Sequence, residues 1–515
     1  IEARTAVWES GSKPEGSRGQ LGIELEHTIV HDDMSPVSYS GQHGVAWLLE
    51  QLRAQYPEAT ADPEGDLLGV ARPGEAVTIE PAAQVELSAG PFSDLAKARE
   101  TFDEFERLVE EILTPVGERM LTEGYHPTAT ARSLELIPKR RYQFMNLYLS
   151  EKDTCGPCMM RGSASTQVSI DYTSTADCLR KLRLAYALVP ILSLITDNTP
   201  VFEGKPRTHQ LVRTKIWQHM DNDRCGLVPG VLDPGFDLRS YAAYILDAPA
   251  ILVPCKKEQW CYSERTFGDI YAERAMTSAE VEHAVSMFFN DVRLKTYIEI
   301  RPADAMPIPY VIAYASLIKG LFYSPESLDA LDELLARVNA KDYEDAKNAL
   351  MAYGYEATVY GKPVAKLCDP VIELAESGLE DEDRPYRDPL AHLVEQRPTP
   401  ATLSDRSRRA KKGARRRWRT VGSSTMGSRS SIKPSSPSNS LALTGGCRRS
   451  SSRRYATWPL AKRGLPVQGR TSPTKIAETI ESWRCRSIGF LQTPVWSWEK
   501  SLAWRAPTDA CVRLV

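Results

Sequence analysis

Four segments of the chain alternate polar and apolar residues with a period of two, the pattern of a β-strand whose faces meet different surroundings. In LGIELEHTI (residues 21–29), Glu24 and Glu26 share one face, while Ile23 and Leu25 share the other. Carboxylates spaced in this way cannot both point into an apolar core, because burying an unpaired charge is costly. The segment therefore predicts a strand with its acidic face toward a polar site or solvent.

The other three segments repeat this alternation. Their polar faces carry Gln84, Glu86 and Ser88, with Glu80 in the same parity (77–88); Ser165, Gln167, Ser169 and Asp171 (163–172); and Tyr297, Glu299 and Arg301 (296–302). For any single strand, a solvated polar face is the ordinary interpretation. Carboxylates gathered on one face of a sheet repel each other unless cations lie between them. If the four strands are neighbours, the sequence favours a site for Mg²⁺ or Mn²⁺, since hard cations prefer oxygen ligands.

Helical periodicity separates these strands. Amphipathic patterns predict helices over residues 93–123, with Ser93 as N-cap, and over residues 174–195, 278–290 and 327–353. Residues 229–235 carry the glycines and prolines of a loop. The longest apolar run, residues 184–196, is short and contains Pro190, so the sequence predicts no membrane-spanning helix.

The sequence lacks the common nucleotide-binding and hydrolytic motifs. It contains no Gly-x-x-x-x-Gly-Lys-Ser/Thr, no Gly-x-Gly-x-x-Gly, no His-Glu-x-x-His and no Gly-x-Ser-x-Gly. A nucleotide would therefore have its phosphates held by carboxylate-bound metal ions and arginines. His27 and His31 lie on the strand face opposite Glu24 and Glu26, and we interpret both as structural.

Six segments together carry a family resemblance. GIELEHTIV, TIEPAAQVELS, MMRGSASTQVSIDY, NTPVFEGKP, LVRTKIWQHMDNDR and TYIEIRPADAMP, in this order over about residues 20–395, resemble the glutamate–cysteine ligase family, in the branch shared by plants and many bacteria. The resemblance implies an α+β fold similar to the catalytic domain of glutamine synthetase, an antiparallel sheet curled into a funnel with helices packed outside. It also implies ATP and Mg²⁺, or Mn²⁺, as cofactors.

The implied reaction is the first step of glutathione biosynthesis. ATP phosphorylates the γ-carboxylate of glutamate, and the amine of cysteine then displaces phosphate to give γ-glutamylcysteine. Because the nucleotide, glutamate and acyl phosphate are all anionic, metal ions and arginines are effective catalysts of such a reaction. The alternatives are a γ-glutamyl ligase for another amine and a non-catalytic protein with a nucleic-acid-binding tail.

The resemblance also assigns roles to individual residues. It implies metal ligands at Glu24, Glu26, Glu80, Glu86 and Glu299, catalytic roles for Arg213 and Arg301, and substrate binding by Arg161, Gln167, Arg213 and Trp217. Arg301 is expected to contact phosphate oxygens, and Arg213 to pair with a carboxylate of glutamate through its planar fork. The structural alternatives are solvated strand edges for the glutamates, surface ion pairs for the arginines, and a core position for Trp217.

One segment departs from the family pattern. Cys155 and Cys158 form Cys-Gly-Pro-Cys, which is also the motif of thioredoxin, where the first cysteine lies at a helix N-terminus. A catalytic dithiol, a regulatory disulfide and an inert loop are the three interpretations. The sequence favours the inert loop, because it shows no helix start here and so short a disulfide loop constrains little of the chain. The low density of the ten cysteines favours a reducing, cytoplasmic setting.

Charge divides the chain near residue 400. Residues 401–515 contain 24 of the 64 Lys and Arg residues but only 5 of the 67 Asp and Glu residues. We therefore predict a catalytic domain over residues 1–400 that acts as a monomer or homodimer and does not bind a membrane. A chain that ends near Gln396 is expected to keep full activity and thermal stability. Residues 401–515 have the Arg, Ser, Trp and Cys content of a GC-rich gene translated out of frame. The alternative is a genuine basic extension, disordered or bound to nucleic acid. Because the first residue is Ile1, we expect the natural chain to begin upstream.

Overall fold

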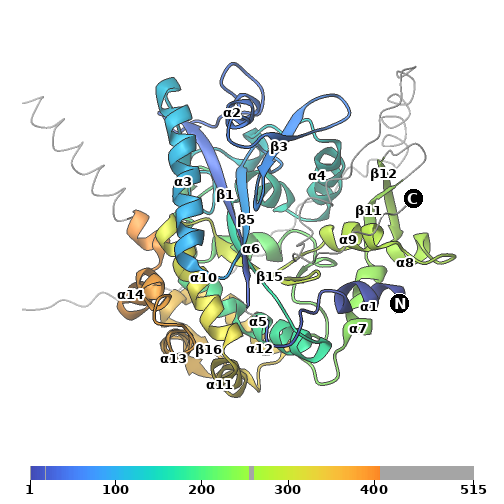
Figure 1. The fold of residues 1–515 in the computed structure, drawn as a ribbon, viewed down its shortest axis with the longest axis vertical. Helices are drawn as coiled ribbons and strands as arrows, with labels where there is room; N and C mark the ends of the chain where they lie inside the picture. The colour runs from blue at the N-terminus through green and yellow to red at the C-terminus, as the bar shows by residue number, and fades with distance from the viewer. Residues whose placement is uncertain (1, 18, 255–259, 406–515) are drawn as a thin grey trace, which may run out of the picture. The chain divides into compact units, whose positions relative to one another are not determined.

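A nine-stranded antiparallel sheet forms the centre of the computed structural model, which describes residues 2–17, 19–254 and 260–405 (Figure 1). The strand order is β14-β15-β7-β1-β5-β4-β3-β2, and β6 pairs with the end of β1. The strands are β1 Leu21–His31, β2 Glu58–Ala61, β3 Leu67–Arg72, β4 Glu75–Ile79, β5 Val85–Phe92, β6 Glu118–Leu121, β7 Ser165–Ile170, β14 Val292–Leu294 and β15 Ile298–Asp304. The described residues belong to one compact unit.

The four predicted strand segments are neighbours in this sheet, as β15-β7-β1-β5. In the register, Glu26 lies opposite Glu86, and Glu24 lies between Ser88 and Gln167. The polar faces of the four strands therefore coincide. The segment over residues 77–88 is a hairpin of β4 and β5 rather than one strand.

The hairpin turn places Glu80 outside the regular strands. The backbone N–H of Glu80 donates to the carbonyl of Gln84 at 2.8 Å, and Ala83 has a φ of 65°. Glu80 therefore stands at the end of the acidic face, where a turn rather than strand alternation sets its direction.

The apolar face of the sheet is covered by helices. Ile23 and Leu25 are fully buried, and α10 (Ile308–Tyr323) packs against β1, β7 and α3 (Leu95–Leu113) on this side (Figure 1). Most of α10 is buried because α13 (Ala365–Ser377) and α14 (Asp388–Gln396) cover it in turn. The core thus lies behind the sheet, which leaves the polar face for a site.

Capping residues and helix breakers set the ends of the predicted helices. The helix predicted over residues 93–123 begins after Asp94, whose carboxylate accepts from the backbone N–H of Ala96 at 2.8 Å. It ends at Leu113 because Pro115 and Gly117, with a φ of 75°, begin a turn that leads into β6.

The remaining helix predictions are confirmed or shortened. The helix over residues 174–195 is α5 (Thr175–Ile195), and Ser174 is its N-cap. The helix over 278–290 is α9 (Ser278–Ser286), which ends before the short strand β13 (Phe289–Asn290). The pattern over 327–353 is two helices, α11 and α12, divided where Asn339 forms a capping box with Asp342. Residues 229–235 form the predicted loop.

Further helices and four small ribbons surround the sheet. The helices are α1 Glu2–Glu9, α2 Val45–Leu52, α4 Arg140–Lys152, α5 Thr175–Ile195, α6 Val212–Gln218, α7 Leu238–Asp247, α8 Phe267–Ile270, α9 Ser278–Ser286, α11 Pro325–Leu335 and α12 Ala340–Tyr353, with a π-helical turn at Cys158–Gly162 and 3₁₀ turns at Thr114–Val116, Ala131–Ser133, Gly354–Glu356 and Arg384–Arg387. The ribbons pair β8 Val201–Phe202 with β9 Lys205–Pro206, β10 Cys225–Gly226 with β13 Phe289–Asn290, β11 Pro249–Pro254 with β12 Trp260–Thr266, and β16 Thr358–Val359 with β17 Lys362–Pro363.

The packed fold continues past the predicted boundary at residue 400. Residues 400–405 are helical, and the backbone N–H of Ala401 donates to the carbonyl of Asp197 at 2.9 Å. Arg397 forms a two-pronged ion pair with Asp369 at 2.6 and 2.7 Å. The rest of the predicted basic tail, residues 406–515, lies outside the described residues.

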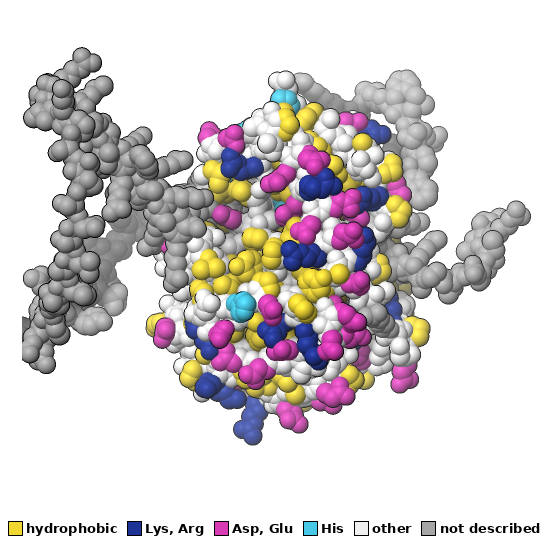
Figure 2. Space-filling model, turned by 60° about the vertical axis from the view of Figure 1, so that its left-hand side comes forward, with side chains coloured by type: hydrophobic (Ala, Val, Ile, Leu, Met, Phe, Trp, Pro, Cys, Tyr) yellow, Lys and Arg dark blue, Asp and Glu magenta, His cyan; other side chains and the backbone are white. Residues whose placement is uncertain are grey.

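The surface turned to the viewer in Figure 2 carries acidic and basic side chains interspersed among apolar ones. On α3, Lys97 pairs with Glu100 at 2.7 Å and Arg107 with Glu111 at 2.6 Å. Such i,i+3 and i,i+4 pairs are typical of a solvent-facing helix surface. Among the helices that the structure describes, none is long and apolar enough to cross a membrane.

Candidate active site

The polar face of the sheet forms one side of a cavity of about 350 Å³. Strands β1, β5, β7 and β15 supply this side, and the start of α4, the π-helical turn, α6 and β14 complete the cavity. Eight of the ten predicted site residues line it, namely Glu24, Glu26, Glu80, Glu86, Gln167, Arg213, Trp217 and Arg301. Glu299 and Arg161 do not.

The carboxylates of Glu26 and Glu86 are held by hydroxyl and amide donors. Glu26 accepts from the backbone N–H and the hydroxyl of Ser165, both at 2.8 Å. Glu86 accepts from the hydroxyls of Thr78 at 3.1 Å and Ser88 at 3.0 Å. These bonds orient both side chains without supplying a neutralising charge.

Burial and mutual repulsion disfavour the charged forms of these carboxylates. Burial, followed by the nearby charge of Glu80, raises the pKa of Glu26 to about 7. Burial, together with the charges of Glu24, Glu80 and Glu26, raises the pKa of Glu86 well above its usual range. A cation among the four groups would relieve this repulsion.

The chemistry of this donor set fits a hard divalent cation. Four carboxylates line this one cavity, and carboxylate oxygens are the ligands that Mg²⁺ and Mn²⁺ prefer. Within residues 2–17, 19–254 and 260–405, however, no three His, Cys, Asp or Glu side chains already converge on one metal position. The described carboxylates therefore share a cavity without forming a ready-made metal site.

Glu299 lies beneath the cavity in a cluster of three cations. Its carboxylate pairs with Arg293 at 2.6 Å, Arg301 at 2.9 Å and Lys295 at 3.0 Å, and the residue is fully buried. Although burial opposes this, the three cations hold the pKa of Glu299 well below its usual range. The structure therefore shows Glu299 as an anchor for basic side chains, and its implied role as a metal ligand stays a prediction.

Arg213 and Trp217 lie one turn apart on α6 and stack on each other. The guanidinium carbon of Arg213 is 3.9 Å from the centre of the Trp217 ring. The indole N–H of Trp217 donates to the carbonyl of Phe289 at 2.9 Å, and Nε of Arg213 donates to the carbonyl of Arg301 at 3.3 Å. The cation thus lies over a fixed aromatic face at the cavity wall.

Arg301 and Gln167 meet across neighbouring strands. Nη1 of Arg301 donates to Oε1 of Gln167 and to the carboxylate of Glu299. Both side chains line the cavity, as predicted. They connect the acidic strands β1 and β5 to the basic side formed by β14 and β15.

Arg161 points away from the cavity. Its guanidinium donates to the carbonyl of Leu134 at 2.9 Å and to the amide oxygen of Asn146 at 2.6 Å. The reason is the π-helical turn, which directs Met159 and Met160 into the cavity instead. The prediction that Arg161 binds substrate is therefore not supported by this geometry.

Four further basic side chains and one tyrosine also line the cavity, and they were not predicted from the sequence. They are Lys139, Arg141 and Tyr142 at the N-cap and start of α4, Arg293 on β14, and Lys295 directly after β14. Burial, followed by the charge of Arg141, lowers the pKa of Lys139 to about 8. Two signals were present in the sequence: the basic run at 139–141, and the alternation of Arg293 and Lys295 one strand before Glu299.

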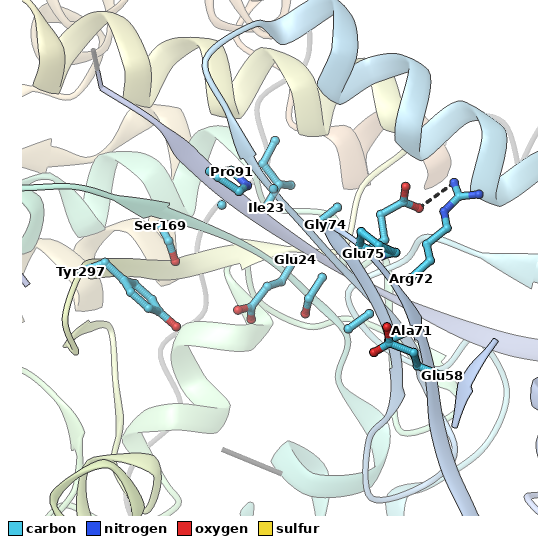
Figure 3. Close-up of a pocket in the computed structure, with 16 residues that line it drawn as sticks. Ile23, Glu24, Glu58, Ala71, Arg72, Gly74, Glu75, Pro91, Ser169 and Tyr297 are labelled. Carbon is cyan, nitrogen blue, oxygen red and sulfur yellow. Dashed lines mark hydrogen bonds and ion pairs between the residues drawn. The ribbon is translucent and has the colours of Figure 1, made fainter. Parts of the chain in front are cut away.

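A second cavity, of about 270 Å³, adjoins the first along the sheet (Figure 3). Glu24 and Ser88 line both cavities. In the second cavity Arg72 pairs with Glu75 at 2.9 Å, so the positive charge of Arg72 is neutralised by a neighbouring residue (Figure 3). The two cavities thus differ in charge and meet at Glu24.

The Cys-Gly-Pro-Cys segment differs from the expected inert loop. Residues 156–162 are helical, so Cys155 directly precedes a helical turn that the sequence did not reveal. His27 is buried with Nδ1 3.1 Å from the carbonyl of Val85, which agrees with a structural role. The side chain of His31 faces Glu118 at 3.4 Å, also outside the cavity.

A sequence model of the glutamate-cysteine ligase family 2 (GCS2) matches residues 20–414. Among curated proteins, glutamate–cysteine ligase B of Oryza sativa subsp. japonica, a chloroplastic protein, is 27% identical over 379 residues, which cover 72% of this chain and 76% of that protein. The Medicago truncatula chloroplastic glutamate–cysteine ligase is 29% identical over 349 residues, with 66% and 69% covered. Among solved structures, the Francisella tularensis glutamate–cysteine ligase in complex with AMP has a TM-score of 0.50 at 11% identity and covers 76% of this chain and 84% of that one, which shows a shared fold.

Proposed function

The chain belongs to the glutamate–cysteine ligase family 2, and from this premise we propose that the cavity on the polar face of the sheet is its active site. The enzyme joins the γ-carboxylate of glutamate to the amine of cysteine with ATP, giving γ-glutamylcysteine, ADP and phosphate, the first step of glutathione biosynthesis. The observation that carries the assignment of the site is the juxtaposition of four carboxylates with a group of arginines and lysines in one cavity.

The acidic side of the cavity suits the nucleotide phosphates and their metal. Glu24, Glu26, Glu80 and Glu86 would hold Mg²⁺, or Mn²⁺, which when bound neutralises phosphate charge. The metal in turn would offset the repulsion that raises the pKa values of Glu26 and Glu86. We therefore place the triphosphate over β1 and β5.

The basic side suits the acyl phosphate and glutamate. Arg301 is fixed by Gln167 and Glu299, so it can face an anion without reorganising. Arg213 lies over Trp217 with Nε bonded to the carbonyl of Arg301, and we propose that its two terminal nitrogens face a carboxylate of the substrate. We propose that Arg213 binds glutamate and that Arg301 contacts the phosphoryl group during its transfer from ATP to glutamate.

The second cavity suits the adenosine part of ATP. Its one arginine is paired with Glu75, and Gly22, Gly74 and Gly90 bring backbone rather than side chains to its lining. Such a site favours a flat, uncharged base over an anion. Because Glu24 belongs to both cavities, a nucleotide seated here would extend its phosphates toward Glu26 and Glu86.

Measurement of ADP release tests the proposal. The purified chain is assayed with ATP, Mg²⁺ and glutamate, first without an acceptor and then with cysteine or with other amines. Release that requires both glutamate and cysteine is the expected result. Release with glutamate and a different amine, but not with cysteine, would reassign the acceptor. Absence of release with every acceptor would contradict a catalytic function.

A further inference from the structure

Cys155 and Cys158 lie on one turn between α4 and β7, and both are nearly buried, with 9% and 7% of their surface exposed. The backbone N–H of Cys155 donates to the carbonyl of His219 at 2.9 Å. The carbonyls of Cys155 and Cys158 accept from Met159 at 3.0 Å and Ser163 at 3.1 Å. The two cysteines are therefore held in a defined backbone geometry.

The two thiols face different chemical groups. Sγ of Cys155 is 3.7 Å from the hydroxyl of Thr154. Sγ of Cys158 is 3.9 Å from Oε1 of Glu203, a carboxylate oxygen that also accepts from the hydroxyl of Tyr125. One thiol is thus placed beside a hydroxyl, and the other beside a proton acceptor.

The pKa values of the two thiols are shifted in opposite directions. A hydrogen bond from Cys158 lowers the pKa of Cys155 to about 6, while the same bond and burial raise the pKa of Cys158. In contrast, burial raises the pKa values of Cys178 and Cys368 to about 12. The two opposite shifts favour the thiolate form at Cys155 and the protonated form at Cys158, which is the division that a reactive dithiol needs.

We propose that Cys155 and Cys158 form a thiol–disulfide exchange site whose reaction partner is a low-molecular-weight disulfide. The Cys155 thiolate attacks one sulfur of that disulfide, forms a mixed disulfide and releases one thiolate. Cys158 then gives its proton to Glu203 and attacks Sγ of Cys155, which releases the second thiolate. The two cysteines are oxidised to a disulfide, and the small disulfide is reduced to two thiols.

A route for the small disulfide lies beside His219. This residue, bonded to Cys155 through its carbonyl, lines an open cavity of about 520 Å³ that also borders Trp217. The imidazole of His219 contributes to the lowered pKa of Cys155 and pairs with Asp153 at 3.4 Å. Cys155 is thus bonded to a residue that lines this open cavity, while its own side chain packs among core residues, so the small disulfide would approach it from the His219 side.

The exchange site is joined to the wall of the candidate active site. Met159 and Met160 follow Cys158 directly and line the cavity. The side-chain amide of Gln84 on the strand side donates to the carbonyls of Ser163 at 2.9 Å and Arg161 at 3.3 Å, and so ties the turn to the sheet. A Cys155–Cys158 disulfide would reshape this turn. If the proposed function holds, oxidation therefore changes the KM for a substrate more than kcat.

The test uses the full chain, equilibrated in mixtures of reduced and oxidised glutathione without cysteine, then alkylated and mapped by peptide mass. We expect a Cys155–Cys158 disulfide whose fraction follows the glutathione ratio. Cys158→Ser should accumulate one glutathione on Cys155, whereas Cys155→Ser should form no adduct at position 158. The matched control Cys178→Ser should behave as the parent. If Cys155 and Cys158 of the parent chain both stay reduced in the most oxidising mixture, the proposal is wrong. This outcome is read from the parent alone, so it does not depend on whether a variant folds.

Two further measurements address the mechanism. Iodoacetamide labelling of Cys155 should reach half its maximal rate near pH 6 in the parent. Glu203→Gln should leave labelling of Cys155 intact but slow closure of the mixed disulfide by about tenfold or more, since it removes the proton acceptor. Labelling that rises only above pH 8, or equal closure rates, would contradict the assigned roles. Peptide mapping does not require ligase activity. The disulfide can therefore be detected even if the proposed function is wrong.

Discussion

The guanidinium of Arg213 covers the Trp217 ring at 3.9 Å, and the indole is itself fixed by its bond to the carbonyl of Phe289. Both residues come from the seven-residue helix α6 at an i,i+4 spacing. The stack sets the plane of the guanidinium before any ligand arrives. An arginine that is orientated in advance loses little freedom on binding a planar carboxylate.

Arg213→Lys tests this orientation. The variant keeps the charge but loses both the planar fork and the stack, so we expect the KM for glutamate to rise by about tenfold or more while the KM for ATP changes little. Steady-state kinetics with each substrate varied in turn gives both values. Arg99→Lys, on the exposed face of α3, is the matched control. Equal rises for both substrates would move Arg213 to a phosphate-binding role.

Glu26→Gln and Glu299→Gln should have opposite effects on stability. Glu26 is repelled by Glu80, so the amide should leave the free energy of unfolding unchanged or slightly raised, yet lower kcat by about 10²–10³ as an electrostatic group is lost. Glu299 neutralises three cations, so its replacement should cost about 3–5 kcal/mol. Urea denaturation and ADP release measure the two effects. A folded Glu26→Gln with the parental rate would remove Glu26 from the metal site.

Truncation should separate chains that end at Gln396 from chains that end at Asp405. The longer chain keeps the Arg397–Asp369 ion pair and the bonds of Thr399 and Ala401 to Asp197, and should melt and react like the full chain. The shorter chain loses them and should be less stable by on the order of 2 kcal/mol or more. Thermal melting and ADP release decide the point. Equal stability of the two truncated chains would show that residues 397–405 are dispensable, as the charge pattern predicted.

Acid should loosen the packing around His283. Burial lowers the pKa of this imidazole to about 4, and its Nε2 bonds the carbonyl of Leu252 at 2.9 Å. Because the unfolded chain binds the proton more tightly, stability is full above pH 6.5 and falls as the pH drops toward 4, by roughly 3 kcal/mol for this group. Urea denaturation at pH 7 and pH 5 should show the loss. His283→Gln should reduce it, whereas His392→Gln, at an exposed position, should not.

Alternation in the sequence was enough to predict the acidic face. A period of two places Glu24 and Glu26 on one side of β1 wherever that strand lies, and the register then sets Glu26 opposite Glu86. Alternation cannot reveal the side chains that a very short strand contributes to the site, because such a strand has too few residues to show the pattern. Arg293 on the three-residue strand β14 lies directly opposite Glu299, and this cross-strand pair is one reason why Glu299 is surrounded by cations.

The direction of Arg161 was hidden for a different reason. A π-helical turn adds one residue to each turn, so it rotates side chains away from the direction that a strand or an α-helix would give them. The same turn explains why no helix start was visible after Cys155. Resemblance places a segment correctly along the chain, but a local change in helix type still decides which of its side chains reach the cavity.

Glu24 is a wall of both cavities, and this has a thermodynamic consequence. A ligand in either cavity changes the electrostatic environment of the same carboxylate, and so changes the free energy of binding in the other. Such coupling is reciprocal: the factor by which nucleotide alters the affinity for glutamate must equal the factor by which glutamate alters the affinity for nucleotide. Two independent binding titrations, each performed with and without the second ligand, must therefore return one coupling free energy.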